Sequence, residues 1–326
     1  MNEELLNILQ TLVTSSTPLV IAALGETLTE RAGVVNLSLD GSITLAAAIG
    51  FIAAVGSGSA LVGIIAAMLV GALIALIIVV ADIELKQDQV AIGFVLTLLA
   101  ASLAQFIGQS YTRVRGPELP FVSLTFLKDI PIIGPVFFTD HNPLVYVSFV
   151  LVFATWWWMF RTRPGLALRA VGERPAAAFA RGTKVNRLRY LYTLLGGSLV
   201  GLAGAAYSLS IKAGWTNPPA MRGDGWIALA IVIFGGWHPF RVVLGAYLFA
   251  GLRAISSAIQ RSPDIQIPLV LINALPWLLM IGTLLLVSSG AIERLLRALP
   301  RPAQVWTRNL LRSDPPAALG TRFEER

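Results

Sequence analysis

Residues 161–189, RTRPGLALRAVGERPAAAFARGTKVNRLR, form a short basic segment between two long apolar runs, and this contrast decides the fold. The segment holds eight Lys or Arg residues and one acid, Glu173, which give it a net charge of +7. The whole chain also carries +7, so the remaining residues balance to zero. If the apolar runs cross a bilayer, a short loop of this kind stays on the cytoplasmic side. We therefore expect residues 161–189, here called the basic segment, to be cytoplasmic.

The composition is typical of a membrane protein. Hydrophobic residues make up 56% of the 326 residues, charged residues make up 13%, and the mean hydropathy is +0.73. A soluble domain carries about 25% charged residues. Apolar runs of about 20 residues, enough to cross about 30 Å of hydrocarbon, recur along the chain. The sequence predicts an all-α, polytopic helical membrane protein with about 8–10 transmembrane helices, some of them broken or re-entrant.

The domain organisation follows from these runs. Residues 1–290 form the predicted transmembrane domain, which contains the basic segment as a loop. Residues 291–326 form a basic tail, which we expect to be cytoplasmic and, because residues 313–326 are polar, to end in a disordered stretch. Residues 226–234 are apolar but too short to cross a bilayer alone. The predicted spans are residues 5–24, 42–55, 60–81, 89–108, 143–160, 190–211, 242–255 and 268–287.

Small residues at four-residue spacing mark candidate contacts between helices, because they let two backbones approach closely. Gly197 and Gly201 form one such pair in the span that follows the basic segment. Gly63, Ala67 and Gly71 form a second series, for which tight packing and a lipid-facing position are equally compatible with the sequence.

Residues 25–41, GETLTERAGVVNLSLDG, are polar although apolar runs flank them on both sides. One interpretation is a cytoplasmic loop with a short amphipathic helix. The other is a broken or re-entrant helix that lines a path, because ionisable groups at membrane depth face a protein interior or a wet cavity. The sequence leaves both open, and with them the side of the N-terminus.

This chain lacks most of the residue types and motifs that enzymes use for catalysis. The chain has no cysteine, two histidines and no GxxxxGK[ST] loop for ATP, so we expect no catalytic, metal or cofactor site. His141 is expected to be solvated in an outer loop, residues 110–142. Intramembrane catalysis by Asp40 with Glu26 or Glu30 is a weaker alternative than a transport role. The excess positive charge lies in one loop, which indicates contact with anionic lipid headgroups rather than nucleic acid.

Within the basic segment, a short helix is predicted after Arg174. Pro175 suits the first helical position and Gly182 lies just past the end. Phe179 provides one large apolar side chain among alanines, and Arg181 in the last turn complements the helix dipole. Such a helix suits insertion into a groove on a partner. The alternative is an ordinary connector whose arginines contact lipid phosphates.

Three segments carry a resemblance to a known family. They are GETLTERAGVVNLSLDG at residues 25–41, GLALRAVGERPAAAFARGTKV at 165–185 and GDGWIALAIVIFGGWHP at 223–239. The chain resembles the permease subunits of ABC importers for nucleosides and simple sugars, in the branched-chain amino acid and ribose permease superfamily. The likeness extends from about residue 18 to about residue 287 of the chain.

The resemblance implies that the basic segment carries a coupling helix seated on a separate ATPase subunit. The residues that match the family's motif are Arg169, Gly172, Glu173, Arg174, Pro175, Ala178 and Gly182. Phe179 and Arg181 complete the expected coupling surface, although Arg181 stands where a small residue is expected. Asp40 stands where the family often has Glu.

The resemblance also implies the partners and the location. We expect a transport subunit without its own ATPase site, in the bacterial cytoplasmic (inner) membrane. A second permease subunit, identical or different, would complete the path, and an extracytoplasmic solute-binding protein would deliver a small-molecule solute. The basic segment and the C-terminus would be cytoplasmic, and no nucleic acid is expected.

The expected solute is a nucleoside, because residues 25–41 resemble the nucleoside branch more than the ribose branch. A ribose-like sugar is the first alternative, and an ion-coupled secondary carrier with a titrating Asp40 or Asp88 is an alternative of another class. Asn36, Asp40 and Gln89 are expected to line or brace the path. Trp226 is expected to stack on a flat ring, or else to belong to an interfacial aromatic belt.

Overall fold

The structure is a computed structural model, and it describes most of the chain up to residue 261 and a separate C-terminal stretch. The described residues are 3–261 apart from 125, 129, 132, 212, 213 and 218, then the isolated residues 274, 277, 278, 281, 282 and 285, and finally 314–324. The helices are α1 (Glu3–Arg31), α2 (Leu39–Ser57), α3 (Ala60–Ile83), α4 (Gln89–Gly108), η1 (Gln109–Tyr111), α5 (Ile133–Phe137), α6 (Pro143–Arg161), α7 (Arg163–Glu173), α8 (Pro175–Ala180), α9 (Val185–Ala206), η2 (Tyr207–Ile211), α10 (Asp224–Phe234) and α11 (Pro239–Arg261).

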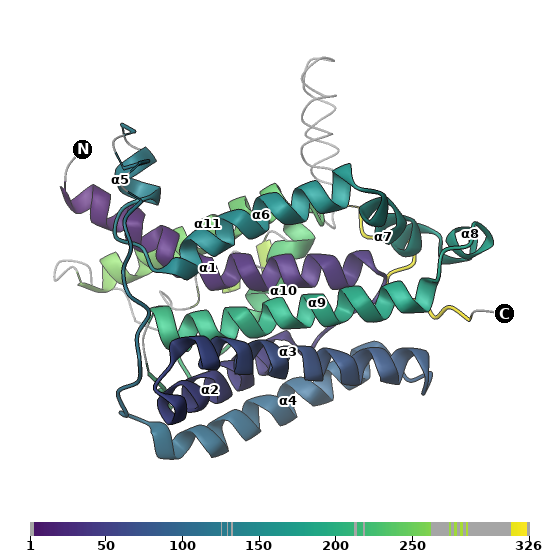
Figure 1. The fold of residues 1–326 in the computed structure, drawn as a ribbon, viewed down its shortest axis with the longest axis horizontal. Coiled ribbons are helices and arrows are strands. Elements are labelled where there is room, and N and C mark those ends of the chain that lie inside the picture. Colours follow the sequence, from purple (N-terminus) through teal and green to yellow (C-terminus); the bar gives the residue numbers. More distant parts are fainter. Residues whose placement is uncertain are drawn as a thin grey trace.

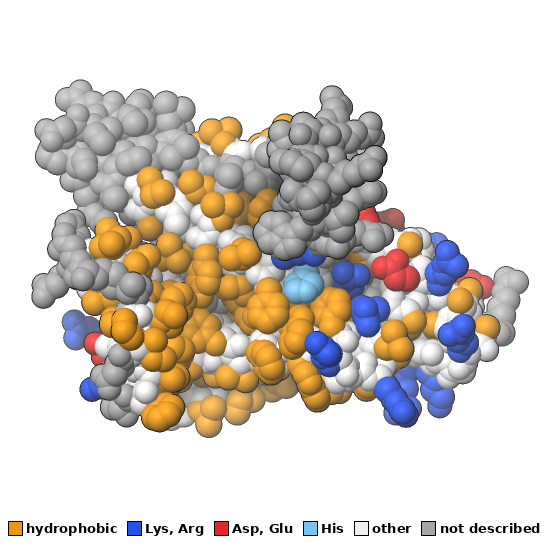
Figure 2. All heavy atoms as spheres, turned by 90° about the horizontal axis from the view of Figure 1, so that it is seen from above, with side chains coloured by type: hydrophobic (Ala, Val, Ile, Leu, Met, Phe, Trp, Pro, Cys, Tyr) orange, Lys and Arg blue, Asp and Glu red, His pale blue; other side chains and the backbone are white. Residues whose placement is uncertain are grey.

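The long helices run side by side, with α9 between α1 and α3 (Figure 1). The helices α7 and α8 and the C-terminal stretch lie at one end of the bundle, and the N-terminus and α5 lie at the other. We call the end with α7 and α8 the basic end. Hydrophobic side chains cover much of the face in Figure 2, whereas Lys and Arg gather at the basic end.

Seven helices in the described part of the chain are long and apolar enough to cross a membrane: α1, α2, α3, α4, α6, α9 and α11, with α9 extended by η2. The predicted polytopic helical membrane protein is therefore confirmed. Helix α10 is apolar but has only 11 residues, as expected from the sequence. The predicted span at 268–287 lies outside the residues that the structure describes as an element.

Local sequence signals explain several helix ends. The Asp88 side chain accepts a hydrogen bond from the backbone N–H of Ala91 at 2.8 Å and so caps α4. Helix α6 begins at Pro143, and the Asn142 side chain accepts a hydrogen bond from Leu144 at 3.1 Å. Helix α2 ends before Gly58, whose φ of 70° suits glycine.

Small residues bring α3 and α9 into close contact. A Cβ atom on Gly71 would lie 2.1 Å from the carbonyl oxygen of Gly197, and one on Gly201 would lie 2.1 Å from that of Ala67. A side chain larger than hydrogen therefore does not fit at either glycine. Both predicted small-residue series are confirmed as helix contacts, and the lipid-facing alternative for Gly63, Ala67 and Gly71 is wrong because all three are buried.

Residues 25–41 are neither an exposed loop nor a separate helix. Helix α1 continues through Pro18 and Gly25 to Arg31, and residues 32–38 connect it to α2. Glu26 is fully buried and Glu30 is 5% exposed. Asn36 in the connection and Asp40 at the start of α2 are buried as well. The acidic and amide side chains of this segment are therefore buried in the bundle, which rules out the loop interpretation.

The expectation that His141 is solvated in an outer loop is wrong. His141 is fully buried, and its ring nitrogens lie 3.1 Å from Thr14 Oγ1 and 2.8 Å from the carbonyl oxygen of Val136. Asp224 is likewise buried, as the first residue of α10. In both cases partners that are distant in sequence satisfy a polar side chain that would otherwise need water.

The end of the chain differs from expectation as well. Residues 314–324 were predicted to be disordered, but they pack against the basic end of the bundle, where Pro316 and Ala318 are buried. The backbone N–H of Ala318 donates to the carbonyl oxygen of Gly172 at 2.8 Å. Backbone hydrogen bonds of this kind do not depend on which side chains are present. The polar, proline-containing sequence therefore gave no signal that this stretch packs against the bundle.

Candidate functional site

The basic segment folds into two short helices at the basic end. Helix α7 begins at Arg163, and the Thr162 hydroxyl accepts a hydrogen bond from the backbone N–H of Gly165 at 3.1 Å. Arg174 separates α7 from α8, and Pro175 occupies the first position of α8 as predicted. Gly182 follows with a φ of +84°, which favours glycine after a helix. The predicted short helix is therefore present.

Helix α8 has one buried face and one exposed face. Ala178 is buried and packs with Val171 and Val185. The Phe179 side chain is 36% exposed, although it is a large apolar group. Arg174, Arg181 and Gly182 are exposed beside it. The exposed face thus combines one aromatic ring with two guanidinium groups.

The end of α7 is pressed against the end of α1. A Cβ atom on Gly172 would lie 2.2 Å from the carbonyl oxygen of Arg31, so a larger residue does not fit. Arg31 forms an ion pair with Glu173, with Nη1 and Oε1 3.6 Å apart. The guanidinium of Arg169 instead lies over the Phe160 ring, 5.1 Å from its centre. Gly172 and Glu173 therefore hold the end of α7 against the end of α1, and Arg169 packs against α6.

A second group of predicted residues lies where α2 and α10 begin. Asp40 is in the first turn of α2, and its Oδ1 accepts hydrogen bonds from the backbone N–H groups of Gly223 at 2.7 Å and Gly225 at 3.2 Å. A carboxylate at a helix N-terminus satisfies free N–H groups and complements the helix dipole. Asp40 therefore caps α10 from another helix.

Asn36 and Gln89 brace the connection between α1 and α2. Asn36 Oδ1 accepts hydrogen bonds from the backbone N–H of Ser38 at 3.0 Å and from its hydroxyl at 2.6 Å. Gln89 Oε1 accepts a hydrogen bond from the backbone N–H of Val35 at 2.7 Å. The backbone N–H of Asn36 donates to Glu26 Oε1 at 3.3 Å. These contacts fix a non-helical stretch inside the bundle.

Trp226 lies in the first turn of α10, two residues after Asp224, and is half-buried. Its ring is tilted against that of Phe94 on α4, with 6.5 Å between the ring centres. The structure thus brings Asp40 and Trp226 to the start of the same helix. Asn36 and Gln89 lie nearer the basic end, on the connection and on the first turn of α4.

Sequence reasoning missed a charged pair at the start of α10. Asp224 is 1% exposed and forms an ion pair with Arg253 of α11, in which Nη1 and Oδ2 are 2.9 Å apart. The Tyr207 hydroxyl also donates to this carboxylate. The available signal was Arg253 itself, because an arginine within an apolar span needs an acidic partner.

The basic end contains a second missed contact. Trp237 donates its indole N–H to the buried carboxylate of Glu30, so the turn between α10 and α11 is tied to α1. The neighbouring His238 ring lies 5.1 Å from the Phe160 ring, measured between centres. Burial lowers the pKa of His238 to about 4, and the nearby positive charges of Arg241 and Arg31 act in the same direction. His238 is therefore neutral near pH 7.

The carboxylates described above contact protein groups. In the described ranges, no three His, Asp or Glu side chains are grouped as a metal ion would require. Each carboxylate described at the basic end and at the start of α10 contacts backbone N–H groups, an arginine, or an aromatic N–H or O–H group. The arrangement can brace helices and present an apolar, basic surface.

Comparisons with known proteins identify the family of the chain. Residues 8–288 match the family described as branched-chain amino acid transport system, permease component. TsgC13 of Haloferax volcanii, provisionally named a glucose ABC transporter permease protein, is 35% identical over 80% of this chain and 81% of its own length. The nucleoside ABC transporter permease protein NupC of Lactococcus lactis is 32% identical over 85% of this chain and 90% of its own. The guanosine ABC transporter permease protein NupQ of Bacillus subtilis is 34% identical over 81% of this chain and 86% of its own length.

Proposed function

The chain belongs to the permease component family of branched-chain amino acid transport systems and is an ABC transporter permease subunit, and from this premise we propose that it imports a nucleoside. A separate ATPase subunit supplies the energy and docks on α8. An extracytoplasmic binding protein delivers the solute to the end of the bundle opposite α8. A second permease subunit, identical or different, completes the path.

The exposed face of α8 is the observation that carries the docking proposal. Phe179 is an aromatic side chain beside Arg174 and Arg181, on a helix that α7 and α9 support from behind. Aromatic and arginine side chains are enriched at the centres of protein interfaces. A lipid contact would use the positive charges but would not need Pro175 and Gly182 to define a helix with one aromatic group.

The charge distribution supports the orientation. The basic segment, which contains α7 and α8, carries a net charge of +7, and segments of this kind remain on the cytoplasmic side. We accordingly place the basic end and the C-terminus in the cytoplasm, and the protein in the bacterial cytoplasmic membrane. Only on that side is ATP available to a docked ATPase.

Two relatives support a nucleoside as the solute, because NupC and NupQ carry nucleoside and guanosine in their names. Trp226 has a half-buried ring at the start of α10 and is suited to stack on a flat base. A sugar is the second candidate, since TsgC13 carries glucose in its name. With either solute, the Asp40 contacts have the same role: they fix α10, which carries the Trp226 ring.

The proposed mechanism is a switch of access between the two faces of the membrane. ATP binding to the docked ATPase shifts α8, and the bundle rearranges around the buried break at residues 32–38. Asn36, Gln89 and Asp40 brace that break and the start of α10, so that the two move together. The solute is neither modified nor covalently bound.

The test is co-purification of the ATPase with variants of α8. Replacing both Arg174 and Phe179 with alanine should abolish co-purification and leave membrane insertion intact. Leu166→Ala is the matched control, because Leu166 is 61% exposed on α7 but lies outside the proposed surface. Unchanged co-purification of the double variant would remove the docking proposal. A binding screen of the cognate binding protein with nucleosides, bases, pentoses and hexoses would then identify the solute.

A further inference from the structure

The C-terminal stretch, residues 314–324, crosses the basic end of the bundle and is here called the strap (yellow in Figure 1). It contacts elements that are far apart in sequence. The backbone N–H of Ala318 donates to the carbonyl oxygen of Gly172 at 2.8 Å, at the end of α7. The backbone N–H of Gly320 donates to the carbonyl oxygen of Gly33 at 3.0 Å, in the connection between α1 and α2. The strap therefore joins α7 to that connection.

The fit of the strap is close at these points. A Cβ atom on Gly33 would lie 3.2 Å from the carbonyl oxygen of Ala318, and Gly33 itself has a φ of +89°. Gly320 has a φ of +70°, which an L side chain rarely adopts. Glycine at both positions lets the two backbones meet.

The far end of the strap contacts the proposed coupling helix. The Phe323 ring meets the Phe179 ring of α8 edge to face, with 5.8 Å between ring centres. Phe323 also packs against the buried cluster of Val171, Ala178 and Val185. Aromatic pairs in this geometry are attractive beyond the area that they bury. The strap is thus a second support for α8, in addition to α7 and α9.

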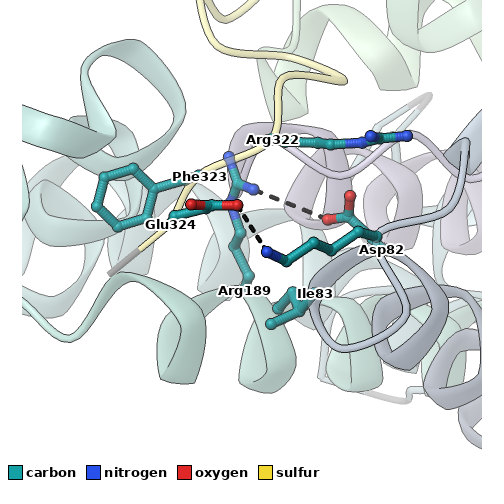
Figure 3. A pocket seen from close by; sticks show the side chains of 7 residues that line it. Asp82, Ile83, Arg189, Arg322, Phe323 and Glu324 are labelled. Atoms are coloured by element: carbon teal, nitrogen blue, oxygen red, sulfur yellow. Dashed lines mark hydrogen bonds and ion pairs between the residues drawn. The ribbon is translucent and has the colours of Figure 1, made fainter. Parts of the chain in front are cut away.

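A buried ion pair lies beneath the strap. Arg189 of α9 and Asp82 of α3 are each 1% exposed at their side chains, and their Nη1 and Oδ2 atoms are 3.8 Å apart. Figure 3 shows Arg189 between Asp82 and the strap residues Phe323 and Glu324. Nη2 of Arg189 donates to the carbonyl oxygen of Thr321 at 3.0 Å. The strap therefore also satisfies part of a guanidinium group that is buried in the bundle.

These contacts form a continuous route from α8 to α10. It runs from Phe179 through Phe323 along the strap to Gly33, and then through residues 33–38 to α2. There Asp40 caps α10. Energetic coupling between distant sites is carried by packed side chains, hydrogen bonds and rigid elements of this kind.

We propose that the strap is a positioning element that transmits the movement of α8 to the buried connection and to the start of α10. This inference rests on the proposed function, because it assumes that an ATPase moves α8. The strap acts after docking: without it the ATPase still binds, but ATP no longer changes the state of α10.

The test uses the absence of cysteine from the chain. Arg222 is exposed and lies just before α10, near Asp40, so Arg222→Cys provides a unique label site in the permease. The permease, its second permease subunit and the ATPase are reconstituted together in nanodiscs. The rate of maleimide labelling at position 222 is then measured with and without ATP and vanadate. In the otherwise unchanged chain, ATP should alter this rate at least threefold. Deletion of residues 314–326 should abolish the change while the ATPase still co-purifies.

Point variants keep the test valid if the deleted chain fails to fold. Phe323→Ala should reduce the ATP-dependent change at least twofold, and Phe323→Tyr, which keeps the ring, should retain it. Glu324→Gln is the matched control within the strap, because its ion pair with Lys86 is exposed and contributes little. An undiminished response to ATP in Phe323→Ala, or loss of the ATPase from that variant, overturns the proposal. Absence of any response in the full chain would contradict the proposed function as well.

Discussion

Asp40 caps a helix to which it does not belong, because its Oδ1 accepts a hydrogen bond from the backbone N–H of Gly223 at 2.7 Å. The residues involved are 183 positions apart in sequence. The contact ties the first turn of α2 to the start of α10, a helix too short to cross the membrane. A negative charge at this position stabilises the positive, N-terminal end of the α10 dipole. Asp40 also lies where the buried connection from α1 ends. A structural change at the basic end can therefore reach Asp40 through that connection.

Removing this cap should impair transport more than assembly. Asp40→Ala leaves two buried N–H groups without an acceptor, which costs about 1–3 kcal/mol of folding stability. Asp40→Asn keeps an acceptor oxygen and should lose less stability, but should still reduce solute uptake because the charge is gone. Uptake and melting temperature in detergent are measured for both. Asp88→Ala, which removes the exposed cap of α4, is the control and should leave uptake unchanged. Full uptake by Asp40→Asn would exclude a role for the charge.

Gly225 tests how closely α10 approaches α2. A Cβ atom there would lie 2.2 Å from the backbone nitrogen of Asp40. Gly225→Ala should therefore separate the two helices and cost about 1–3 kcal/mol, which is typical of overpacking. Gly56→Ala is the comparison, because nothing lies within 4 Å of its added Cβ atom. A melting temperature of Gly225→Ala equal to that of Gly56→Ala would show that α2 and α10 do not meet in this way.

The Asp224–Arg253 pair should behave as a unit. Asp224→Asn or Arg253→Gln alone leaves one charged group without its partner, whereas the double variant removes both charges. A double-mutant cycle on melting temperature should give a coupling energy of about 1–3 kcal/mol. The exposed pair of Lys86 and Glu324 should give less than about 1 kcal/mol in the same cycle. Additive effects at Asp224 and Arg253 would contradict the ion pair.

The pH dependence of stability should contain a contribution from His238. Its pKa is lowered to about 4 in the folded protein, from an ordinary value of about 6.5. Between these values the unfolded chain binds more protons than the folded one, so this residue makes the protein less stable as the pH falls from 6.5 to 4. His238→Gln should lose less melting temperature than the parent chain between pH 7.5 and pH 5. An equal loss in both proteins would place His238 in water.

Strong local signals allowed several elements to be predicted from the sequence. The predicted span at residues 89–108 coincides with α4, because an aspartate cap and an apolar run define it locally. The bounds of α8 follow in the same way from Pro175 and Gly182. The contact between α3 and α9 was visible as small residues at regular spacing.

The polar contacts inside the bundle could not be predicted, because they join residues that are distant in sequence. Gln89 accepts a hydrogen bond from Val35, 54 positions away, and Arg253 pairs with Asp224, 29 positions away. A polar stretch such as residues 32–38 has the same composition in a solvated loop as in a buried break. The strap was missed for a related reason, since Ala318 and Gly320 are held through their backbone N–H groups.

The central claim is that this chain transports only when a separate ATPase docks on α8. The most direct test is solute uptake into proteoliposomes that contain the permease with its second permease subunit, with the binding protein outside and the ATPase and ATP in the lumen. The comparison is the permease alone under a proton or sodium gradient. The account predicts uptake only with the ATPase and ATP present, and loss of that uptake in the Arg174 and Phe179 double alanine variant. Uptake by the permease alone, driven by the ion gradient, would contradict it.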